Sequence, residues 1–308
     1  METRQIGSLT VSLVGLGCNN FGGRLDAEGT RKVVHAALDA GITFLDTADI
    51  YGGTKSEEFM GRALAGRRHD VVLATKFGMK VDDRRKGAKP AYVRQALDDS
   101  LRRLSTDRID LYQLHQPDPE TPIAHTLAAL DEAVKSGKVR EIGCSNFTAA
   151  QIREAQAAVK DGSARFVSVQ NEYSLLHREP EREVLAECER QGLAFLPFFP
   201  LASGLLTGKY RRGEPGPKGA RLTGNDKSHF LSERNQEVAE KLAAFAVARG
   251  HTLLELAFSW LASHSAVASV IAGATKPEQV QANVKAAGWK LSPEDLAEID
   301  RIAPLSVG

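Results

Sequence analysis

Short apolar runs recur along the chain and alternate with segments of helical periodicity. Eight of the runs are rich in β-branched residues and leucine, and polar loops separate them from the helical segments. Runs of this length and composition are typical of buried parallel strands. The predicted strands are Leu13–Cys18, Thr43–Asp46, Val71–Lys76, Ile109–His115, Glu141–Ser145, Phe166–Gln170, Ala194–Phe198 and Ser269–Gly273.

In the intervening segments, proline and glycine mark many of the helix ends. Proline in the first turn and glycine just past the last turn are typical helix boundaries. The helices predicted between the strands are Thr30–Ala40, Ser56–Leu64, Pro90–Leu104, Pro122–Val134, Gln151–Val159 and Pro180–Arg190. A longer interval follows, with a loop over Gly208–Asn225 and helices over Glu233–Arg249 and Leu253–His264, and the chain ends with helices over Pro277–Ala287 and Pro293–Ile302.

The spacing of the strands predicts the fold class. Seven strands begin at intervals of about 30 residues, which is the length that a strand, a crossover helix and two loops require. Eight such units without a change in composition favour a single α/β domain over residues 1–308. We expect a closed (β/α)8 TIM barrel with extra helices near the C-terminus. An open, doubly wound sheet is the alternative.

Three predicted strands end in an ionisable residue: Asp46, Lys76 and His115, with Tyr51 five residues beyond the first. The carboxyl ends of barrel strands meet at one rim, so we expect these four side chains to lie together. Each has a structural alternative. Asp46 and Lys76 could form a buried ion pair, His115 could be a hydrogen-bonded core residue, and Tyr51 could lie on the surface. Because buried charge is costly unless it is paired, the coincidence of all four favours a functional site.

The other strand ends carry polar or aromatic residues. They are Ser145 and Asn146, Gln170 and Asn171, Phe198, and Gly273. Ser145 and Asn146 could instead cap the next helix, and one of Phe198 and Phe199 could belong to the core.

Two common kinds of site are not expected. Gly15-Leu16-Gly17 begins like a dinucleotide-binding glycine fingerprint, but Asn20 stands where the third glycine would be. The histidines show no spacing typical of metal ligands, so we predict no metal site.

Charge and cysteine content narrow the class of protein. Forty basic and 39 acidic residues give a net charge of +1, so no overall basic field is available to bind nucleic acid or a membrane surface. The three cysteines are few and far apart, which favours a reducing compartment. No run approaches the roughly 18 apolar residues of a membrane span, and the first residues lack the apolar core of a signal peptide. We expect a cytoplasmic protein, either a monomer or a weak homo-oligomer.

Seven motifs, in this order and spacing, resemble the aldo-keto reductase superfamily. They are FLDTADIYG, VVLATKFG, DLYQLHQPD, GCSNF, VQNEY, PLASGLLTGKY and IAGATKPEQVQAN, and the resemblance runs from about Leu13 to Trp289. The pattern is most similar to the bacterial aryl-alcohol-dehydrogenase-like and potassium-channel-β-like branches. The resemblance implies a catalytic tetrad of Asp46, Tyr51, Lys76 and His115.

The resemblance also implies a nicotinamide dinucleotide across the barrel mouth. Ser145, Asn146 and Gln170 match the residues that hold the carboxamide, and Phe198 matches the aromatic ring that stacks on the nicotinamide. Further matches are Leu201, Gly204, Leu206 and Lys209 in the loop over the pyrophosphate, and Gly273, Thr275, Lys276, Gln279 and Asn283 in the adenosine-phosphate segment. Many relatives carry arginine where this chain has Gln279. We expect NADPH, with Lys276 compensating, and NADH as a possible substitute.

The implied reaction is the reduction of an aldehyde or ketone to an alcohol. Tyr51 would be the general acid, Lys76 would lower its pKa, Asp46 would neutralise Lys76, and His115 would orient the carbonyl. The loops after His115 and over Gly208–Phe230 are expected to shape the substrate pocket. The alternatives are an NADP(H)-binding, redox-sensing regulatory module and, less favoured, a barrel hydrolase that uses aspartate and histidine.

Overall fold

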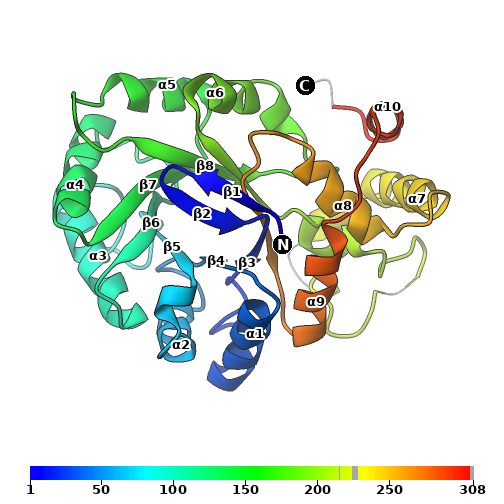
Figure 1. Ribbon diagram of the computed structural model, residues 1–308, viewed down its shortest axis with the longest axis horizontal. Coiled ribbons are helices and arrows are strands. Elements are labelled where there is room, and N and C mark those ends of the chain that lie inside the picture. Colours follow the sequence, from blue (N-terminus) through cyan, green and yellow to red (C-terminus); the bar gives the residue numbers. More distant parts are fainter. Residues whose placement is uncertain (215, 224–227, 306–308) are drawn as a thin grey trace.

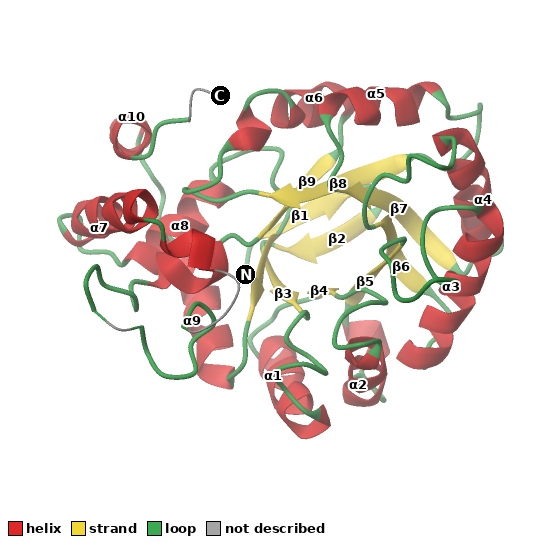
Figure 2. Ribbon diagram, turned by 180° about the vertical axis from the view of Figure 1, so that it is seen from behind, coloured by secondary structure: helices red, strands yellow, loops and turns green. Residues whose placement is uncertain are grey.

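The computed structural model describes residues 1–308 except 215, 224–227 and 306–308. Its centre is a barrel of eight parallel strands in the order β10-β3-β4-β5-β6-β7-β8-β9 (Figures 1 and 2). The strands are β3 (Val14–Gly17), β4 (Phe44–Asp46), β5 (Val72–Phe77), β6 (Ile109–Leu114), β7 (Val139–Ser145), β8 (Phe166–Glu172), β9 (Ala194–Phe198) and β10 (Val270–Gly273). All eight predicted strands are therefore present.

The two ends of the sheet approach each other between β9 and the segment before β10. Phe195 pairs with Val267, and its amide donates to the Ala266 carbonyl at 2.6 Å. The amide of Ala268 donates to the Phe195 carbonyl at 3.0 Å. These contacts make the barrel nearly closed, so the predicted (β/α)8 fold is confirmed and the open-sheet alternative is wrong.

Helices surround the barrel, as Figure 2 shows. The ring consists of α1 (Ala27–Asp39), α2 (Lys55–Ala63), α3 (Pro90–Leu104), α4 (Ile123–Lys135), α5 (Ala149–Ala157), α6 (Val184–Gln191), α8 (Leu253–Ala262) and α9 (Pro277–Ala286). Outside it lie α7 (Glu233–Val247) and α10 (Pro293–Ile302), at the right of Figure 1. Short 3-10 turns occur at Arg68–Asp70, Glu179–Glu181, Ala202–Thr207 and Ser228–Leu231.

Local capping explains where the helix boundaries differ from the predicted ones. Thr148 and Gln151 form a reciprocal capping box, so α5 begins at Ala149, two residues earlier than expected. Thr148 therefore takes the capping role that Ser145 and Asn146 could have had. The predicted helix Pro180–Arg190 is divided into a 3-10 turn and α6. Part of the predicted loop Gly208–Asn225, residues 215 and 224–225, lies outside the described residues.

A β-hairpin that the sequence analysis did not predict covers one end of the barrel (Figure 1). It consists of β1 (Thr3–Ile6) and β2 (Leu9–Ser12), paired antiparallel. Ile6, Leu9 and Val11 are buried in one apolar cluster with residues of the barrel strands such as Phe44 and Leu111. Because this apolar plug occupies the end where the strands begin, the end where they terminate is left for a site.

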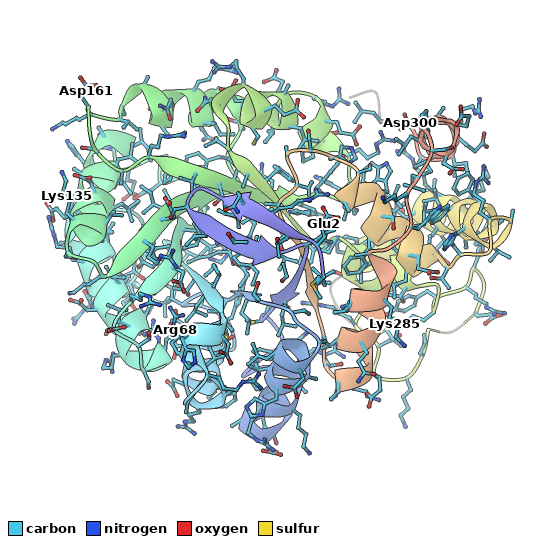
Figure 3. The ribbon with its side chains drawn as sticks, viewed as in Figure 1. Glu2, Arg68, Lys135, Asp161, Lys285 and Asp300 are labelled. Atoms are coloured by element: carbon cyan, nitrogen blue, oxygen red, sulfur yellow. The ribbon has the colours of Figure 1, made fainter. Side chains whose placement is uncertain are left out.

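Charged side chains lie mainly on the outside of the helical ring. Figure 3 labels Lys135 and Asp161 at the periphery of the molecule. Among the described helices, none combines the length and the apolar composition that crossing a bilayer requires.

Candidate active site

A buried ion pair lies where the strands end. The Lys76 ammonium is 2.6 Å from Oδ2 of Asp46 and also donates to the Thr47 carbonyl at 2.9 Å. The side chain of Lys76 is fully buried and that of Asp46 is 4% exposed. Burial alone would lower the pKa of Lys76, but the charge of Asp46 and the proximity of Tyr51 outweigh it, so the pKa of Lys76 is raised. Lys76 is therefore a fixed cation at neutral pH.

Two glutamines complete the surroundings of Asp46. Gln113 on β6 donates to Oδ1 at 3.1 Å, and Gln170 on β8 donates to the same oxygen at 3.2 Å. Both carboxylate oxygens are thus satisfied inside the barrel, which burial of a charge requires. The sequence analysis did not single out Gln113, although a glutamine inside the apolar run Leu111–Leu114 is a signal that could have identified it.

Tyr51 lies against Lys76 and His115. The Lys76 ammonium is 5.2 Å from the centroid of the Tyr51 ring, and the rings of Tyr51 and His115 meet edge to face with 5.8 Å between centroids. Burial raises the pKa of Tyr51, and Lys76 offsets only part of that effect. Lys76 thus lowers the pKa of Tyr51 as expected, but burial raises it more, so the net pKa is raised and the phenol is protonated at neutral pH.

His115 directly follows β6, with its amide hydrogen-bonded to the Phe77 carbonyl at 2.8 Å. Burial, together with the charge of Lys76, lowers the pKa of His115 to about 3, so the ring is neutral near pH 7. Its Nδ1 atom has no hydrogen-bond partner among the described residues. A neutral imidazole carries one N–H donor, and this geometry suits donation to a ligand oxygen beside Tyr51.

Ser145 and Asn146 connect the ends of three strands. The Ser145 hydroxyl donates to the Gln170 carbonyl at 2.7 Å, and the Asn146 amide group donates to the His115 carbonyl at 2.9 Å. Asn146 has φ of 61°, a left-handed conformation that asparagine adopts more readily than most residues. This turn places both side chains at the rim.

A cavity of about 590 Å³ opens above these groups. Of the predicted site residues, those lining it are Asp46, Tyr51, His115, Ser145, Asn146, Gln170, Phe198, Leu201, Gly204, Lys209, Gly273, Thr275, Gln279 and Asn283. Lys76 lies beneath Tyr51 and Asp46 and does not line the cavity. Leu206 is fully buried in the core, and Lys276 is exposed just before α9, so neither lines it.

Two cations at the cavity were not anticipated from the sequence. Arg24 and Arg221 line it together with Lys209. Burial lowers the pKa of Lys209, and the two arginines lower it further. Arg24 comes from the loop after β3 and Arg221 from the loop after the 3-10 turn Ala202–Thr207, so only the folded chain reveals the cluster. Such a concentration of positive charge favours an anionic ligand.

The cavity has the features that a dinucleotide requires. Three residues of its lining each have a buried polar atom that lacks a partner among the described residues: Nδ1 of His115, Oδ1 of Asn20 and Oγ of Ser203. Packing favours glycine at position 273, since an added Cβ there would lie 3.1 Å from Nδ2 of Asn20, which is closer than most Cβ contacts. Lys209, Arg24 and Arg221 could bind phosphate groups, and Phe198 could stack against an aromatic ring.

Comparison with known proteins identifies the family. The sequence model described as "Aldo/keto reductase family" matches residues 13–304. The chain belongs to the aldo/keto reductase family. It is therefore an oxidoreductase of the kind that acts on small-molecule carbonyl compounds with a nicotinamide dinucleotide, and the recognition made from the motifs is confirmed.

Several relatives of this aldo/keto reductase are similar over nearly their whole length. Aldo-keto reductase YhdN of Bacillus subtilis is 35% identical over 309 residues, which cover 96% of this chain and 90% of that protein. Uncharacterized oxidoreductase YqkF of the same organism is 35% identical over 302 residues, covering 96% of this chain and 94% of that protein.

Two solved structures share the barrel. The glycerol dehydrogenase AKR11B4 from Gluconobacter oxydans superposes with a TM-score of 0.85 at 30% identity, covering 99% of this chain and 97% of that one. The holo form of aldo-keto reductase AKR11C1 from Bacillus halodurans gives a TM-score of 0.82 at 34% identity, with coverage of 100% and 98%.

Proposed function

We propose that this protein reduces aldehyde and ketone carbonyls to alcohols with NADPH, and that Tyr51 is the general acid. One observation carries the proposal: a half-buried, protonated phenol lies between a buried ammonium and a neutral imidazole at the floor of the cavity. In this reaction the bound nicotinamide supplies the hydride. The protein must then supply a proton to the carbonyl oxygen.

Tyr51 donates that proton, and Lys76 stabilises the phenolate that remains. As negative charge develops on the substrate oxygen, the phenol of Tyr51 transfers its proton to it and becomes a phenolate. Lys76 stabilises the phenolate by its charge, and Asp46 holds Lys76 in place at 2.6 Å. A proton from solvent restores the phenol after the alcohol leaves. General acid catalysis of this kind contributes roughly 10²- to 10⁴-fold.

His115 serves the same oxygen as a neutral donor. Its N–H can hold the carbonyl beside Tyr51 and stabilise the developing charge, which is worth roughly 10²- to 10³-fold for one well-placed donor. Because the imidazole is already neutral, it does not compete with Tyr51 as a strong acid.

The dinucleotide would lie along the residues that line the cavity. Ser145, Asn146 and Gln170 offer neutral donors and acceptors to a carboxamide. Phe198 ends β9 with its ring facing the cavity and offers an apolar face to the nicotinamide. Lys209 would contact the pyrophosphate. Leu206 lies behind this wall in the core, so its contribution would be to support the loop.

Preference for NADPH rests on the segment before α9. Lys276 is the N-terminal cap of α9, and because an ammonium cannot accept a hydrogen bond it leaves the helix N-terminus without a side-chain cap. Its side chain is exposed, so the helix N-terminus and the ammonium could both meet a 2′-phosphate. Gln279 is turned back and accepts from the Thr275 amide at 2.7 Å, so it shapes the Thr275 loop.

The test is a panel of carbonyl substrates with NADPH, followed by its absorbance and by isolation of the alcohol. We expect turnover of aldehydes, including aryl aldehydes, and of small ketones, with one alcohol formed per NADPH oxidised. Tight NADPH binding without turnover of any aldehyde, ketone or sugar would contradict the proposal and favour a redox-sensing role.

A further inference from the structure

A second buried polar cluster lies on the outer side of the barrel wall, behind the candidate active site. We call it the outer cluster, and it consists of Asp49, Glu57, Tyr92, Arg103 and Tyr112. These residues come from the loop after β4, from α2, from α3 and from β6. Asp49 is 2% exposed, and Glu57 and Tyr112 are fully buried.

The hydrogen bonds of the outer cluster are distributed unequally between its two carboxyl groups. Glu57 accepts from Arg103 at 2.6 Å and from the Thr75 hydroxyl at 2.6 Å. Asp49 accepts a long hydrogen bond, 3.5 Å, from the Tyr92 hydroxyl to Oδ2, and the neighbouring Ile50 amide also acts on its carboxyl group. Its Oδ1 atom has no partner among the described residues. Asp49 therefore occupies a buried position without the donors that a carboxylate needs.

The charge balance leads to the same conclusion. The outer cluster holds two carboxyl groups and a single guanidinium, and Arg103 is committed to Glu57. A second negative charge in this position would be both desolvated and close to a like charge, which favours the neutral acid. Burial, and then the charge of Glu57, raise the pKa of Asp49 to about 7, although Arg103, Tyr92 and the Ile50 amide act in the opposite direction.

Asp49 is connected to the catalytic candidates through the backbone. Its amide donates to the Lys76 carbonyl at 3.0 Å, and the Tyr51 amide donates to the Ala48 carbonyl at 3.2 Å. The turn from Asp46 to Tyr51 therefore presents Asp46 and Tyr51 to the cavity and Asp49 to the outer cluster. A shift of the Asp49 side chain would be passed to Tyr51 two residues later.

We propose that Asp49 is a positioning residue for Tyr51 and that its side chain carries a proton in the working enzyme. Loss of this proton loosens the turn from Asp46 to Tyr51 and slows carbonyl reduction. The inference rests on the proposed function, because it assigns Tyr51 the role of acid. Reduction then falls as the pH rises through about 7. Asp49 holds its proton in about nine-tenths of molecules at pH 6 and about one-tenth at pH 8.

The first test looks at the proton itself. Infrared difference spectra of the wild-type protein between pH 6 and pH 8 should show loss of a protonated carboxyl band that the Asp49→Asn variant lacks. Asp161→Asn is the matched control, because Asp161 is exposed at the periphery (Figure 3). A wild-type spectrum without that band would overturn the proposal, whether or not the protein reduces carbonyls.

The second test is the ratio of kcat at pH 6 to kcat at pH 8. We expect a ratio of up to about tenfold in the wild type and in Asp161→Asn, and a ratio near one in Asp49→Asn, whose side chain is neutral at both pH values. If Asp49→Asn keeps the wild-type ratio, Asp49 does not position Tyr51. Absence of wild-type turnover at both pH values would instead contradict the proposed function.

Tyr92→Phe provides an independent variant that leaves the carboxyl group in place. The Tyr92 hydrogen bond lowers the pKa of Asp49, so its removal should move both the infrared change and the fall in kcat to higher pH. A fall in kcat at the wild-type pH in Tyr92→Phe would contradict the assignment even if Asp49→Asn did not fold.

Discussion

The ammonium of Lys76 lies 2.6 Å from the carboxylate of Asp46, and both groups are buried. Lys135 and Asp131 are also 2.6 Å apart, but the Lys135 side chain is 64% exposed. The two pairs share a geometry and differ in environment, so they give a matched comparison of what burial does to an ion pair.

Replacing Lys76 with Met should destabilise the protein by about 3–5 kcal/mol, because it leaves a buried carboxylate without its counter-charge. Lys135→Met should cost about 0–1 kcal/mol, as exposed pairs do. Urea unfolding measures both. Equal losses in the two variants would show that burial of the Asp46–Lys76 pair does not matter for stability.

Replacing Gln113 with Leu tests the support of Asp46. The Gln113 side chain donates to Oδ1 of Asp46 at 3.1 Å, and a hydrogen bond to a charged group contributes about 1.5–3 kcal/mol. We expect the free energy of unfolding to fall by about 1.5–3 kcal/mol. We also expect kcat to fall, because Asp46 holds Lys76 beside Tyr51. Gln5→Leu, at an exposed position on β1, is the control. Unchanged stability in Gln113→Leu would remove Gln113 from the site.

His115 should make stability depend on pH in the acid range. Its pKa is lowered to about 3 in the folded protein from about 6.5 in an unfolded chain. Between these values the unfolded state binds more protons, so stability falls as the pH falls, by about 1.4 kcal/mol per pH unit. His115→Gln should lack this loss. The measurement is the free energy of unfolding of the wild type and of His115→Gln at several pH values from 6.5 to 4. A difference between the two proteins that stays constant over this range would contradict the assigned pKa of His115.

Lys276→Met should weaken use of NADPH and spare NADH. A charge-assisted contact with the 2′-phosphate is worth about 1.5–3 kcal/mol, so kcat/KM for NADPH should fall roughly 10- to 100-fold. Gln279→Arg should act in the opposite direction by adding a bidentate partner. The measurement is kcat/KM of each variant with NADPH and with NADH. An equal fall in kcat/KM for both cofactors in Lys276→Met would show that the lysine does not contact the 2′-phosphate.

The sequence pattern was sufficient to predict the barrel and the convergence of Asp46, Lys76 and His115. Each of these residues lies at the end of a parallel strand or directly after it, and such ends meet at one rim whatever the details of packing. The β1–β2 hairpin was not predicted because its strands have four residues each, too few for alternation to be distinguished from chance.

Other parts of the site depend on distances that no pattern contains. Arg24 and Arg221 reach the cavity from loops about 200 positions apart in the chain. The net pKa of Tyr51 also depends on the depth of burial, which outweighs the neighbouring cation. The position of Asp49 on the outer side of the wall follows from the turn between Asp46 and Tyr51, in which neighbouring side chains face opposite directions.

The most direct measurement of the central claim is the turnover of Tyr51→Phe with NADPH and an aryl aldehyde, together with its NADPH dissociation constant from protein fluorescence. Removing the hydroxyl should lower kcat by roughly 10²- to 10⁴-fold and leave NADPH affinity within about twofold, since the phenol does not hold the cofactor. Turnover close to the wild-type value in a variant that still binds NADPH would contradict the assignment of Tyr51 as the proton donor.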